Sequence, residues 1–233
     1  MSSIYLIPNF LGESSADMVL PNQIGSVVRS LKHFIVENEK SARKFIKQIA
    51  PDKSQQELVF FTINKHTSPD ELPSFLEPCT NGFSMGIISE AGCPGIADPG
   101  AEIVKIAHKK QIKVIPLVGP SSILLAMMAS GLNGQSFAFN GYLPIDKSDR
   151  RKTLKSLEKK AVESNQTQIF IETPYRNDKM LADLKEILQP TTTLCIACDI
   201  SLETEEIKTQ TIAQWRKMNI SFQKRPAIFI IGS

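Results

Sequence analysis

Short apolar runs that read as β-strands alternate with helical stretches along most of the chain. SIYLIP is strand-like, and QIGSVVRSLKHF follows it with apolar residues at helical spacing, at Ile24, Val28, Leu31 and Ile35. Further strands are predicted in FIVEN, ELVFFTIN, FSMGIIS and IKVIPLVG. Alternation of this kind predicts an α/β fold with largely parallel sheets. If antiparallel strands are present as well, we expect them in the second half of the chain.

Proline, serine and glycine mark the ends of several predicted helices. Ser68 stands before Pro69 as an N-cap, and Asp98-Pro99 opens a helix in the same way. PSSILLAMMASG predicts a helix closed by Gly131 in the left-handed conformation. KTLKSLEKKAVE and DKMLADLKEIL predict later helices, among the strand candidates QSFAFNGYL, QTQIFIET, TTLCIACDI and RPAIFIIGS.

A chain of 233 residues can form two α/β domains of about 100–120 residues each. We predict the boundary near VGPSS, which gives domains 1–117 and 118–233 with a cleft between them. Hydrophobic residues make up 42% and charged residues 22%, as in proteins that bury a core. The formal net charge of +3 is too small to indicate a nucleic-acid partner by itself.

Targeting and metal-binding signals are weak. The first residues, MSSIYLIPNFLG, lack the features of a secretory signal, and no apolar run approaches the ~18–20 residues of a membrane span, so we expect a cytoplasmic protein. Cys195 and Cys198 have CxxC spacing, but the chain has no second CxxC or close His pair to complete a zinc site. Because they lie in an apolar strand-like run, we predict buried free thiols and no metal.

Two strand–turn–helix junctions, SEAGCPGIADPG and LVGPSSILLAMM, are rich in glycine, proline and serine. Ligands of open α/β sheets bind at the carboxyl ends of strands, and N–H groups at helix starts can hold a carboxylate or hydroxyls. The chain lacks GxxxxGK[ST], GxGxxG and GxSxG, which disfavours a P-loop nucleotidase, ordinary dinucleotide binding and an α/β-hydrolase. The junctions therefore indicate a different ligand site, or else two ordinary tight turns.

Five ordered segments resemble motifs of the tetrapyrrole methylase superfamily, in its branch of ribosomal small-subunit RNA 2′-O-ribose methyltransferases. SEAGCPGIADPG resembles SDAGTPxxSDPG, and IPLVGPSSILLAMMASGL resembles PGPSAxxxALxxSGL. FAFNGYLP is similar to FxFxGFLP, FIETPYRNDKML to FYESPHRLxxxL, and RPAIFIIGS to the closing strand. The resemblance runs from about Ile87 to the C-terminus.

This resemblance implies two α/β domains of the tetrapyrrole methylase (class III methyltransferase) type, a homodimer, and S-adenosylmethionine bound in the interdomain cleft. It implies direct in-line methyl transfer to a ribose 2′-hydroxyl of ribosomal RNA, without a metal. A small-molecule or tetrapyrrole-like acceptor is one alternative, and a non-catalytic S-adenosylmethionine-binding interaction protein is another. Carried over by position, the cofactor-binding residues are Ser89, Glu90, Ala91, Gly92, Ile96, Asp98, Ser121, Ser122, Tyr142, Pro226 and Ala227, and the resemblance implies that the last two close the adenine side of the cofactor.

The N-terminal third departs from the motifs of this branch. Where the branch has ATPIGNLxDIT, this chain has LIPNFLGESSADMVLP, and Asn38 stands where EDTRxTxxLL has an aspartate. Leu202 replaces the lysine of RELTKxxEE, and Tyr175 replaces the histidine of ESPHR. These changes bear on the methyl acceptor more than on the cofactor.

Two carboxylates are candidate catalytic groups. A ribose hydroxyl is a poor nucleophile, so we expect a carboxylate or a positioned polar group beside it. Glu90 and Glu172 are the candidates in the resembling motifs. The alternative for Glu172 is an ion pair with Arg176.

The stretch DKSDRRKTLKSLEKK, after GYLP, carries many cations. A polyanion such as RNA is a natural partner, because phosphate contacts supply most sequence-independent RNA affinity. The alternative is a solvated helix face over an inner stripe of Leu154, Leu157 and Ala161, and no aromatic residue interrupts the stretch. The candidate RNA-binding residues are Arg150, Arg151, Lys152 and Lys155.

Overall fold

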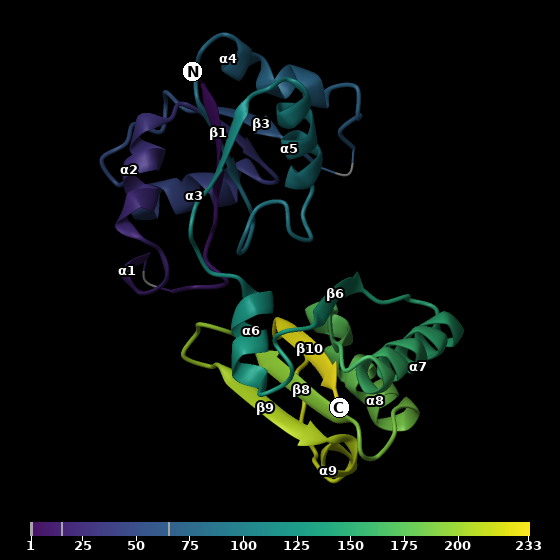
Figure 1. Cartoon of the computed structure of the whole chain (residues 1–233). Helices are drawn as coiled ribbons and strands as arrows, with labels where there is room; N and C mark the ends of the chain where they lie inside the picture. The colour runs from purple at the N-terminus through teal and green to yellow at the C-terminus, as the bar shows by residue number, and fades with distance from the viewer. Residues whose placement is uncertain (1, 15, 65) are drawn as a thin grey trace. The chain divides into compact units, whose positions relative to one another are not determined.

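The computed structural model describes residues 2–14, 16–64 and 66–233 of the chain. Internal contacts divide the chain into two compact units, Met1–Ser121 and Ser122–Ser233, hereafter unit 1 and unit 2 (Figure 1). The predicted boundary between residues 117 and 118 lies in the connection from the last strand of unit 1 to the first helix of unit 2. Each unit is built on its own five-stranded sheet.

The sheet of unit 1 is entirely parallel, with the order β3-β2-β4-β1-β5. Its two central neighbours, β1 and β4, align Ile7 with Ile88, so their carboxyl ends lie side by side. Parallel pairing here follows the prediction from alternating strands and helices. The strands are β1 (Ser3–Ile7), β2 (His33–Val36), β3 (Val59–Thr62), β4 (Met85–Ile88) and β5 (Lys113–Pro116).

Helices cover both faces of this sheet. Successive residues of β2 point to opposite sides, so Phe34 packs in one core cluster and Ile35 in the other. The first cluster includes residues of α2 and α3, and the second includes residues of η1, α4 and α5. The helices of unit 1 are α1 (Ala16–Val19), α2 (Asn22–Ser30), α3 (Glu39–Ile49), the 3₁₀ helix η1 (Leu72–Leu76), α4 (Glu77–Thr80) and α5 (Gly100–Lys109).

Two helix predictions in unit 1 are wrong in their boundaries. The helix predicted through QIGSVVRSLKHF ends at Ser30, because β2 starts at His33 and takes Ile35 into the sheet. The helix predicted to start after Ser68 begins as a 3₁₀ helix at Leu72 instead. The Ser68 hydroxyl accepts a hydrogen bond from Asp70 N in a local turn, which competes with helix initiation.

The sheet of unit 2 has the order β6-β7-β10-β8-β9. β6 pairs with β7 in parallel, and the other three pairings are antiparallel, which confirms antiparallel strands in the second half. Strand β9 was not predicted, because EIKTQT lacks an apolar pattern. The strands are β6 (Phe137–Tyr142), β7 (Thr167–Ile171), β8 (Thr193–Cys198), β9 (Glu206–Thr211) and β10 (Ala227–Gly232).

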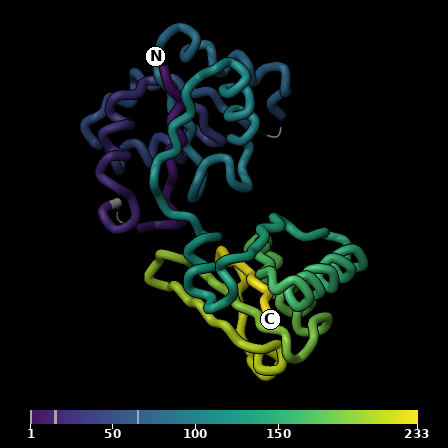
Figure 2. Tube along the Cα trace, in the orientation of Figure 1, coloured from purple at the N-terminus to yellow at the C-terminus, as the bar shows by residue number. Residues whose placement is uncertain are grey.

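Helices α7, α8 and α9 contribute to one large core cluster with β7, β8 and β10, and α6 contacts β8, β9 and β10. The C-terminal strand β10 runs through the middle of the sheet (Figure 2). Gly131 has a φ of +73° and follows the last residue of α6, as predicted. The helices are α6 (Ser122–Ser130), α7 (Lys147–Glu163), the 3₁₀ helix η2 (Pro174–Arg176), α8 (Asn177–Ile187) and α9 (Ile212–Arg216).

Cys195 and Cys198 lie on β8 as free thiols, and their burial is as predicted. Burial raises the pKa of both thiols, that of Cys198 to about 11, so both are protonated at neutral pH. Among the helices of the described residues, none has the length and apolar content needed to cross a membrane.

Candidate functional site

Loops that follow β1 and β4 in unit 1 are tied together at Asn9 and Gly92. The backbone groups of the two residues exchange hydrogen bonds, with N···O distances of 2.9 and 3.1 Å. The Asn9 side-chain amide also donates to the carbonyl oxygens of Ser89 (2.9 Å) and Glu90 (3.3 Å). Asn9 thereby holds the SEAG turn against the end of β1.

The loop that follows β5 joins the same group. Cys93 Sγ donates to the carbonyl oxygen of Pro120 at 3.4 Å. Gly119 packs so closely on the Pro8 ring that a side chain at position 119 would overlap it. The carboxyl ends of β1, β4 and β5 therefore carry one connected set of loops, the location where open α/β sheets bind ligands.

Residues of the SEAGCPGIADPG loop divide into an inner and an outer set. Ser89 is buried and its hydroxyl donates to Gly92 O at 2.5 Å, while Gly92 has a φ of +67° that favours glycine. Glu90, Ala91 and Ile96 are exposed, Ile96 by 53%. An apolar or hydrogen-bonding ligand could contact the outer set directly, whereas the inner set shapes the turn.

Asp98 organises the second half of this loop. Its Oδ1 accepts hydrogen bonds from Gly95 N (2.6 Å) and Gly100 N (2.8 Å), which places the carboxylate at the start of α5. Burial raises the pKa of Asp98, and the two hydrogen bonds act in the opposite direction. Burial first, and then the charges of Asp98 and Glu90, raise the pKa of Glu37 at the end of β2. These three carboxylates form an acidic edge of unit 1.

Asn38, which stands where the resembling family has an aspartate, is the N-cap of α3. Its Oδ1 accepts hydrogen bonds from Lys40 N (2.9 Å) and Ser41 N (3.2 Å), a role that aspartate and asparagine share. The Ser41 hydroxyl hydrogen-bonds to Glu90 Oε1 at 2.5 Å. Helix α3 therefore fixes the side chain of Glu90, which remains exposed.

The remaining predicted cofactor residues lie near the start of unit 2 or within it. Ser121 and Ser122 are half-buried, and Ser122 is the first residue of α6. Tyr142 ends β6 with its side chain 58% exposed, while Pro226 is exposed and Ala227 is buried at the start of β10. The structure therefore assembles the Ser89–Asp98 loop locally, and the contact of each predicted residue with a cofactor stays a prediction.

Glu172 lies just after β7 and pairs with Arg176. Its buried Oε1 accepts hydrogen bonds from Arg176 Nη2 (2.6 Å) and Nε (2.9 Å), and from Thr173 N (2.7 Å). This carboxylate oxygen is saturated by local donors. The geometry matches the ion-pair alternative, and it leaves Glu90 as the accessible carboxylate of the two candidates.

The segment before β10 is held at several points. Asn177 Nδ2 donates to the carbonyl oxygens of Phe222 (3.3 Å) and Arg225 (2.6 Å). Arg225 Nε donates to Asp199 Oδ2 at 2.7 Å, and its Nη1 to Glu206 at 3.1 Å. These contacts fix the backbone that leads into the predicted adenine-side residues, Pro226 and Ala227.

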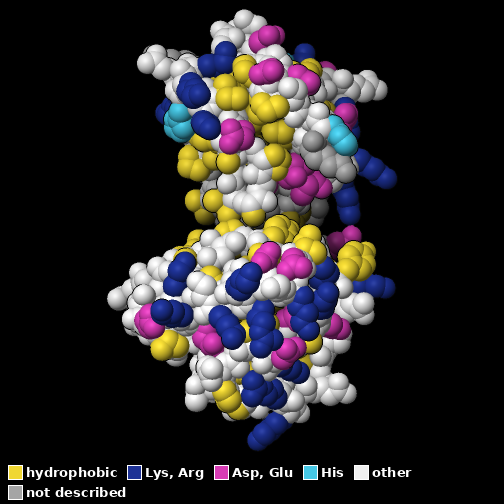
Figure 3. Space-filling model, turned by 90° about the vertical axis from the view of Figure 1, so that its right-hand side faces the viewer, with side chains coloured by type: hydrophobic (Ala, Val, Ile, Leu, Met, Phe, Trp, Pro, Cys, Tyr) yellow, Lys and Arg dark blue, Asp and Glu magenta, His cyan; other side chains and the backbone are white. Residues whose placement is uncertain are grey.

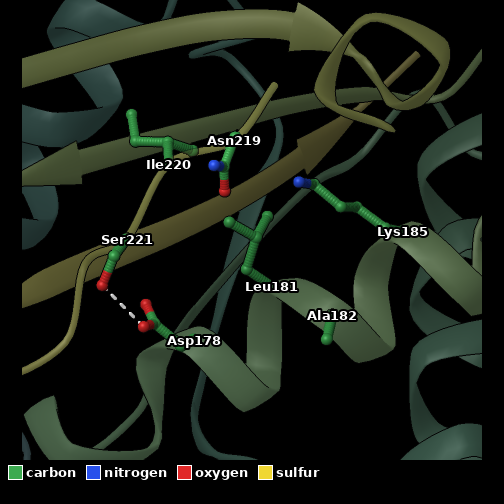
Figure 4. A pocket seen from close by; sticks show the side chains of 7 residues that line it. All are labelled: Asp178, Leu181, Ala182, Lys185, Asn219, Ile220 and Ser221. Atoms are coloured by element: carbon green, nitrogen blue, oxygen red, sulfur yellow. Dashed lines mark hydrogen bonds between the residues drawn. The ribbon is translucent and has the colours of Figure 1, made fainter. Parts of the chain in front are cut away.

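An open hollow of about 530 Å³ lies beside the same segment (Figure 4). Asp178 and Ser221 both line it and point toward each other, and the Ser221 hydroxyl donates to Asp178 at 2.6 Å. Lys185 Nζ donates to Met218 O at 3.0 Å. These polar groups are occupied by hydrogen bonds within the chain. We therefore interpret the hollow as part of the packing that supports the segment before β10. Its lining residues are Asp178, Leu181, Ala182, Lys185, Asn219, Ile220 and Ser221.

One of the four predicted RNA-binding residues has a structural role instead. Arg150 is only 4% exposed, and its guanidinium donates to Asp183 at 2.7 Å and to the carbonyl oxygens of Pro144 and Ile145. We therefore remove Arg150 from the RNA-binding set, because its charge faces the interior. Its sequence neighbour Arg151 is exposed, since adjacent helical residues point about 100° apart.

The exposed side of α7 is strongly basic. Lys and Arg side chains gather on the face of unit 2 shown in Figure 3. Exposed carboxylates on α7 are limited to Asp149 and Glu163. Its exposed cations are Lys147, Arg151, Lys152, Lys155, Lys159 and Lys160.

Three contacts of these loops were missed by sequence reasoning. Asn9 lies in the N-terminal third, where the family motif is absent, and no pattern links it to residues 80 positions later. The Arg225–Asp199 ion pair and the Cys93–Pro120 contact also join distant positions. A proline before Asn9, just past a strand, was the only local sign of a special turn.

Comparison with known proteins identifies related families. The family model described as Tetrapyrrole (Corrin/Porphyrin) Methylases matches residues 21–215. The chain is 33% identical over 176 residues to the ribosomal RNA small subunit methyltransferase I of Buchnera aphidicola subsp. Schizaphis graminum, covering 74% of this chain and 60% of that protein. It is 30% identical over 154 residues to the protein of the same name from Vibrio cholerae, covering 66% of this chain and 52% of that protein. The chain thus spans between half and three fifths of the length of these relatives.

Solved structures share the fold of the whole chain. The methyltransferase CobJ superposes with a TM-score of 0.66 at 14% identity, covering 100% of this chain and 95% of CobJ. A uroporphyrin-III C-methyltransferase from Thermus thermophilus, solved as a complex with S-adenosylhomocysteine, gives a TM-score of 0.58 at 14% identity, covering 100% and 98%. These similarities extend over both units.

Proposed function

The chain belongs to the tetrapyrrole (corrin/porphyrin) methylase family, and from this premise we propose that it is an S-adenosylmethionine-dependent methyltransferase of small-subunit ribosomal RNA. The proposed acceptor is a ribose 2′-hydroxyl. One observation carries the proposal: the segments that resemble this branch follow the carboxyl ends of strands. The Ser89–Asp98 loop follows β4, GPSS follows β5, and the GYLP and ETPYR turns end or follow β6 and β7.

The residues present suit an adenosyl cofactor. Ala91 and Ile96 offer exposed apolar surface, and the backbone of the SEAG turn is fixed by Asn9 and by the buried Ser89 hydroxyl, which leaves the side chains of Glu90 and Ala91 exposed. The start of α6 at Ser122 offers N–H groups of a kind that binds carboxylates. S-adenosylmethionine would supply a methyl group on a sulfonium, whose C–S bond breaks as the acceptor oxygen bonds to carbon. The proposed contacts of the cofactor are the eleven predicted residues, of which Ser89 is the first and Ala227 the last in the sequence.

Glu90 is the proposed polar group beside the acceptor. It is exposed, held by Ser41, and adjacent in sequence to the proposed cofactor contacts Ser89 and Ala91. It can accept a hydrogen bond from a hydroxyl and take its proton. Glu172 is proposed to position the ETPYR turn through Arg176. If Glu172→Gln abolished transfer while the fold and cofactor affinity stayed intact, Glu172 rather than Glu90 would be the candidate base.

Homodimerisation, a cytoplasmic location and a place in ribosomal RNA processing belong to the same proposal. Their support is the family resemblance. Light scattering of the purified chain should give twice the mass of 25.8 kDa, and a mass of one chain would count against the dimer.

The first experiment is a calorimetric titration with S-adenosylhomocysteine. We expect one site per chain, because the proposed contacts occur once in each. Transfer of labelled methyl groups is then measured to small ribosomal subunits, naked ribosomal RNA and a tetrapyrrole such as uroporphyrinogen. Label in RNA that resists alkaline cleavage at one position supports 2′-O-methylation. Label in the tetrapyrrole would replace the RNA proposal, and binding without transfer would leave a non-catalytic cofactor-binding protein.

A further inference from the structure

Two tyrosines stand exposed at neighbouring strand ends of unit 2. Tyr142 ends β6 and is 58% exposed, while Tyr175 follows β7 and is 74% exposed. The two strands are parallel, and Tyr142 pairs with Ile171, the last residue of β7. Both rings therefore come from the same end of the sheet. The Cα atoms of Tyr142 and Tyr175 lie at most about 20 Å apart, since four residues span about 13 Å and paired strands about 5 Å.

The backbone at Tyr142 has an irregularity that determines where this side chain points. The register between β6 and β7 shifts between Phe139 and Tyr142, and Gly141 has a φ of +62°. Bulges of this kind redirect a side chain from the regular alternation of a strand. The ring of Tyr142 stays largely outside the core as a result.

Tyr175 is presented from a rigid turn. On one side Glu172 holds Arg176 and Thr173 N, and on the other Lys224 N donates to Pro174 O at 2.8 Å. The turn is fixed although the ring itself packs little. An exposed aromatic ring on a pre-ordered backbone loses little conformational entropy when it binds a partner.

Cations lie on the two helices that follow these strand ends, α8 and α7. Lys179 lies four residues after Tyr175, about one helical turn along η2 and α8, and makes no ion pair with the described residues. Helix α7 starts at Lys147, five residues after Tyr142, and carries six exposed cations against two exposed carboxylates. Lys155 likewise makes no ion pair within the described part of the chain. Helix α7 lies on the right of unit 2 in Figure 1, the side that Figure 3 turns toward the viewer.

We propose that Tyr142, Tyr175 and the basic side of α7 form a platform on which unpaired bases of a single-stranded RNA segment stack while its phosphates contact the lysines. The inference rests on the proposed function and names the form of RNA that is recognised. Aromatic rings beside a cationic groove bind single strands, because every unpaired base offers a flat face. The bases of a duplex are stacked on one another, so a duplex can use only the cations.

The test measures fluorescence anisotropy of a labelled unstructured uridine oligonucleotide and of a hairpin duplex of the same length. Tyr175→Ala should weaken binding of the single strand at least about fivefold and leave duplex binding within twofold. Tyr175→Trp should retain the affinity for the single strand. Lys155→Ala should weaken both RNAs and make binding less dependent on salt. Tyr175 is used because Tyr142 also belongs to the proposed cofactor set.

The matched control is Phe83→Ala, which removes an aromatic ring of unit 1 that is also 58% exposed; it should change neither affinity. Single-strand affinity unchanged in Tyr175→Ala, or an equal loss for the duplex, would overturn the platform. An anionic peptide that competes as well as the uridine strand would also overturn it, in favour of a protein partner. Titration of the wild-type protein with S-adenosylhomocysteine separates the failure of the RNA platform from the failure of the methyltransferase proposal. If that ligand does not bind but Tyr175→Ala still loses single-strand affinity, the platform stands and the methyltransferase proposal fails.

Discussion

Arg225 Nε lies 2.7 Å from Asp199 Oδ2, and this ion pair joins the connection between β8 and β9 to the residue just before Pro226. Asp199 has a φ of +51° and also accepts a hydrogen bond from the Thr204 hydroxyl. The pair therefore holds a strained turn and the entrance to β10 together. The segment proposed to contact adenine depends on residues more than 20 positions earlier.

Asp199→Asn should lower both stability and cofactor affinity. The variant keeps an oxygen that can accept from Arg225 Nε but loses the negative charge that faces the guanidinium, so we expect it to lose part of the about 1.5–3 kcal/mol that a hydrogen bond between charged groups contributes. Urea unfolding measures the stability, and titration with S-adenosylhomocysteine measures the affinity. Arg29→Ala is the control, since the Arg29–Asp52 pair is exposed to solvent and should contribute little to stability. Unchanged affinity in Asp199→Asn would show that the ion pair supports the fold only.

Asn9→Ala tests the brace on the SEAG turn. The variant leaves the carbonyl oxygens of Ser89 and Glu90 without the Asn9 amide, and we expect a loss of about 1–3 kcal/mol in unfolding free energy. Affinity for S-adenosylhomocysteine should fall as the turn loosens. Asn133→Ala in unit 2 removes a comparable bond, from Nδ2 to Asn165 O at 2.7 Å, and should leave that affinity unchanged. Equal affinities for both variants would contradict a role of Asn9 in the site.

Arg150→Met should strongly destabilise the chain. It leaves the buried Asp183 carboxylate without its guanidinium partner, and breaking a buried pair in this way costs about 3–5 kcal/mol. Arg151→Met breaks the exposed pair with Glu186 and should cost below about 1 kcal/mol. The midpoint of thermal unfolding compares the two variants directly. Similar midpoints for the two variants would show that the buried Arg150–Asp183 pair does not stabilise the fold more than the exposed Arg151–Glu186 pair does.

Asp98→Asn should change how stability depends on pH. Burial raises the folded-state pKa of Asp98, so the native state holds this proton more tightly than the unfolded chain. The unfolding free energy of the wild type is therefore reduced as pH rises from about 4, the unfolded value, through the raised folded pKa. The variant keeps an oxygen for Gly95 N and Gly100 N but has no proton to lose. Its stability relative to the wild type should rise between about pH 4 and pH 7.

Urea unfolding at several pH values between these limits measures the effect. Asp98→Ala serves as the comparison, because it removes the hydrogen-bond acceptor as well as the charge and should be less stable than Asp98→Asn throughout. If the stability difference between the wild type and Asp98→Asn did not change with pH, burial would not be raising this pKa.

Local patterns were sufficient for most of the fold. Runs such as TQIFI and AIFIIG are apolar enough to be buried on both faces, and Gly131 ends α6 because glycine accepts a positive φ without strain. Sequence patterns failed to predict the secondary structure where the local pattern was weak or where strand pairing overrode it. Ile35 continues a helical spacing in sequence, but pairing of β2 with β3 and β4 places it in the sheet. EIKTQT forms β9 because β8 offers it a complete hydrogen-bonded partner, not because its own side chains favour a strand.

The family, the parallel sheet of unit 1 and the candidate loops were predictable from the sequence, since these depend on the order of residues along the chain. Which side chains of those motifs remain accessible became clear only from the folded chain. Arg150 and Arg151 are adjacent and chemically identical, yet one binds Asp183 inside the core and the other faces water. Both Glu90 and Glu172 were candidates from the sequence, with an Arg176 ion pair as the alternative for Glu172, and the structure has that pair while Glu90 stays exposed. Burial and pairing arise from residues that meet in space, and no local pattern encodes which distant residues will meet.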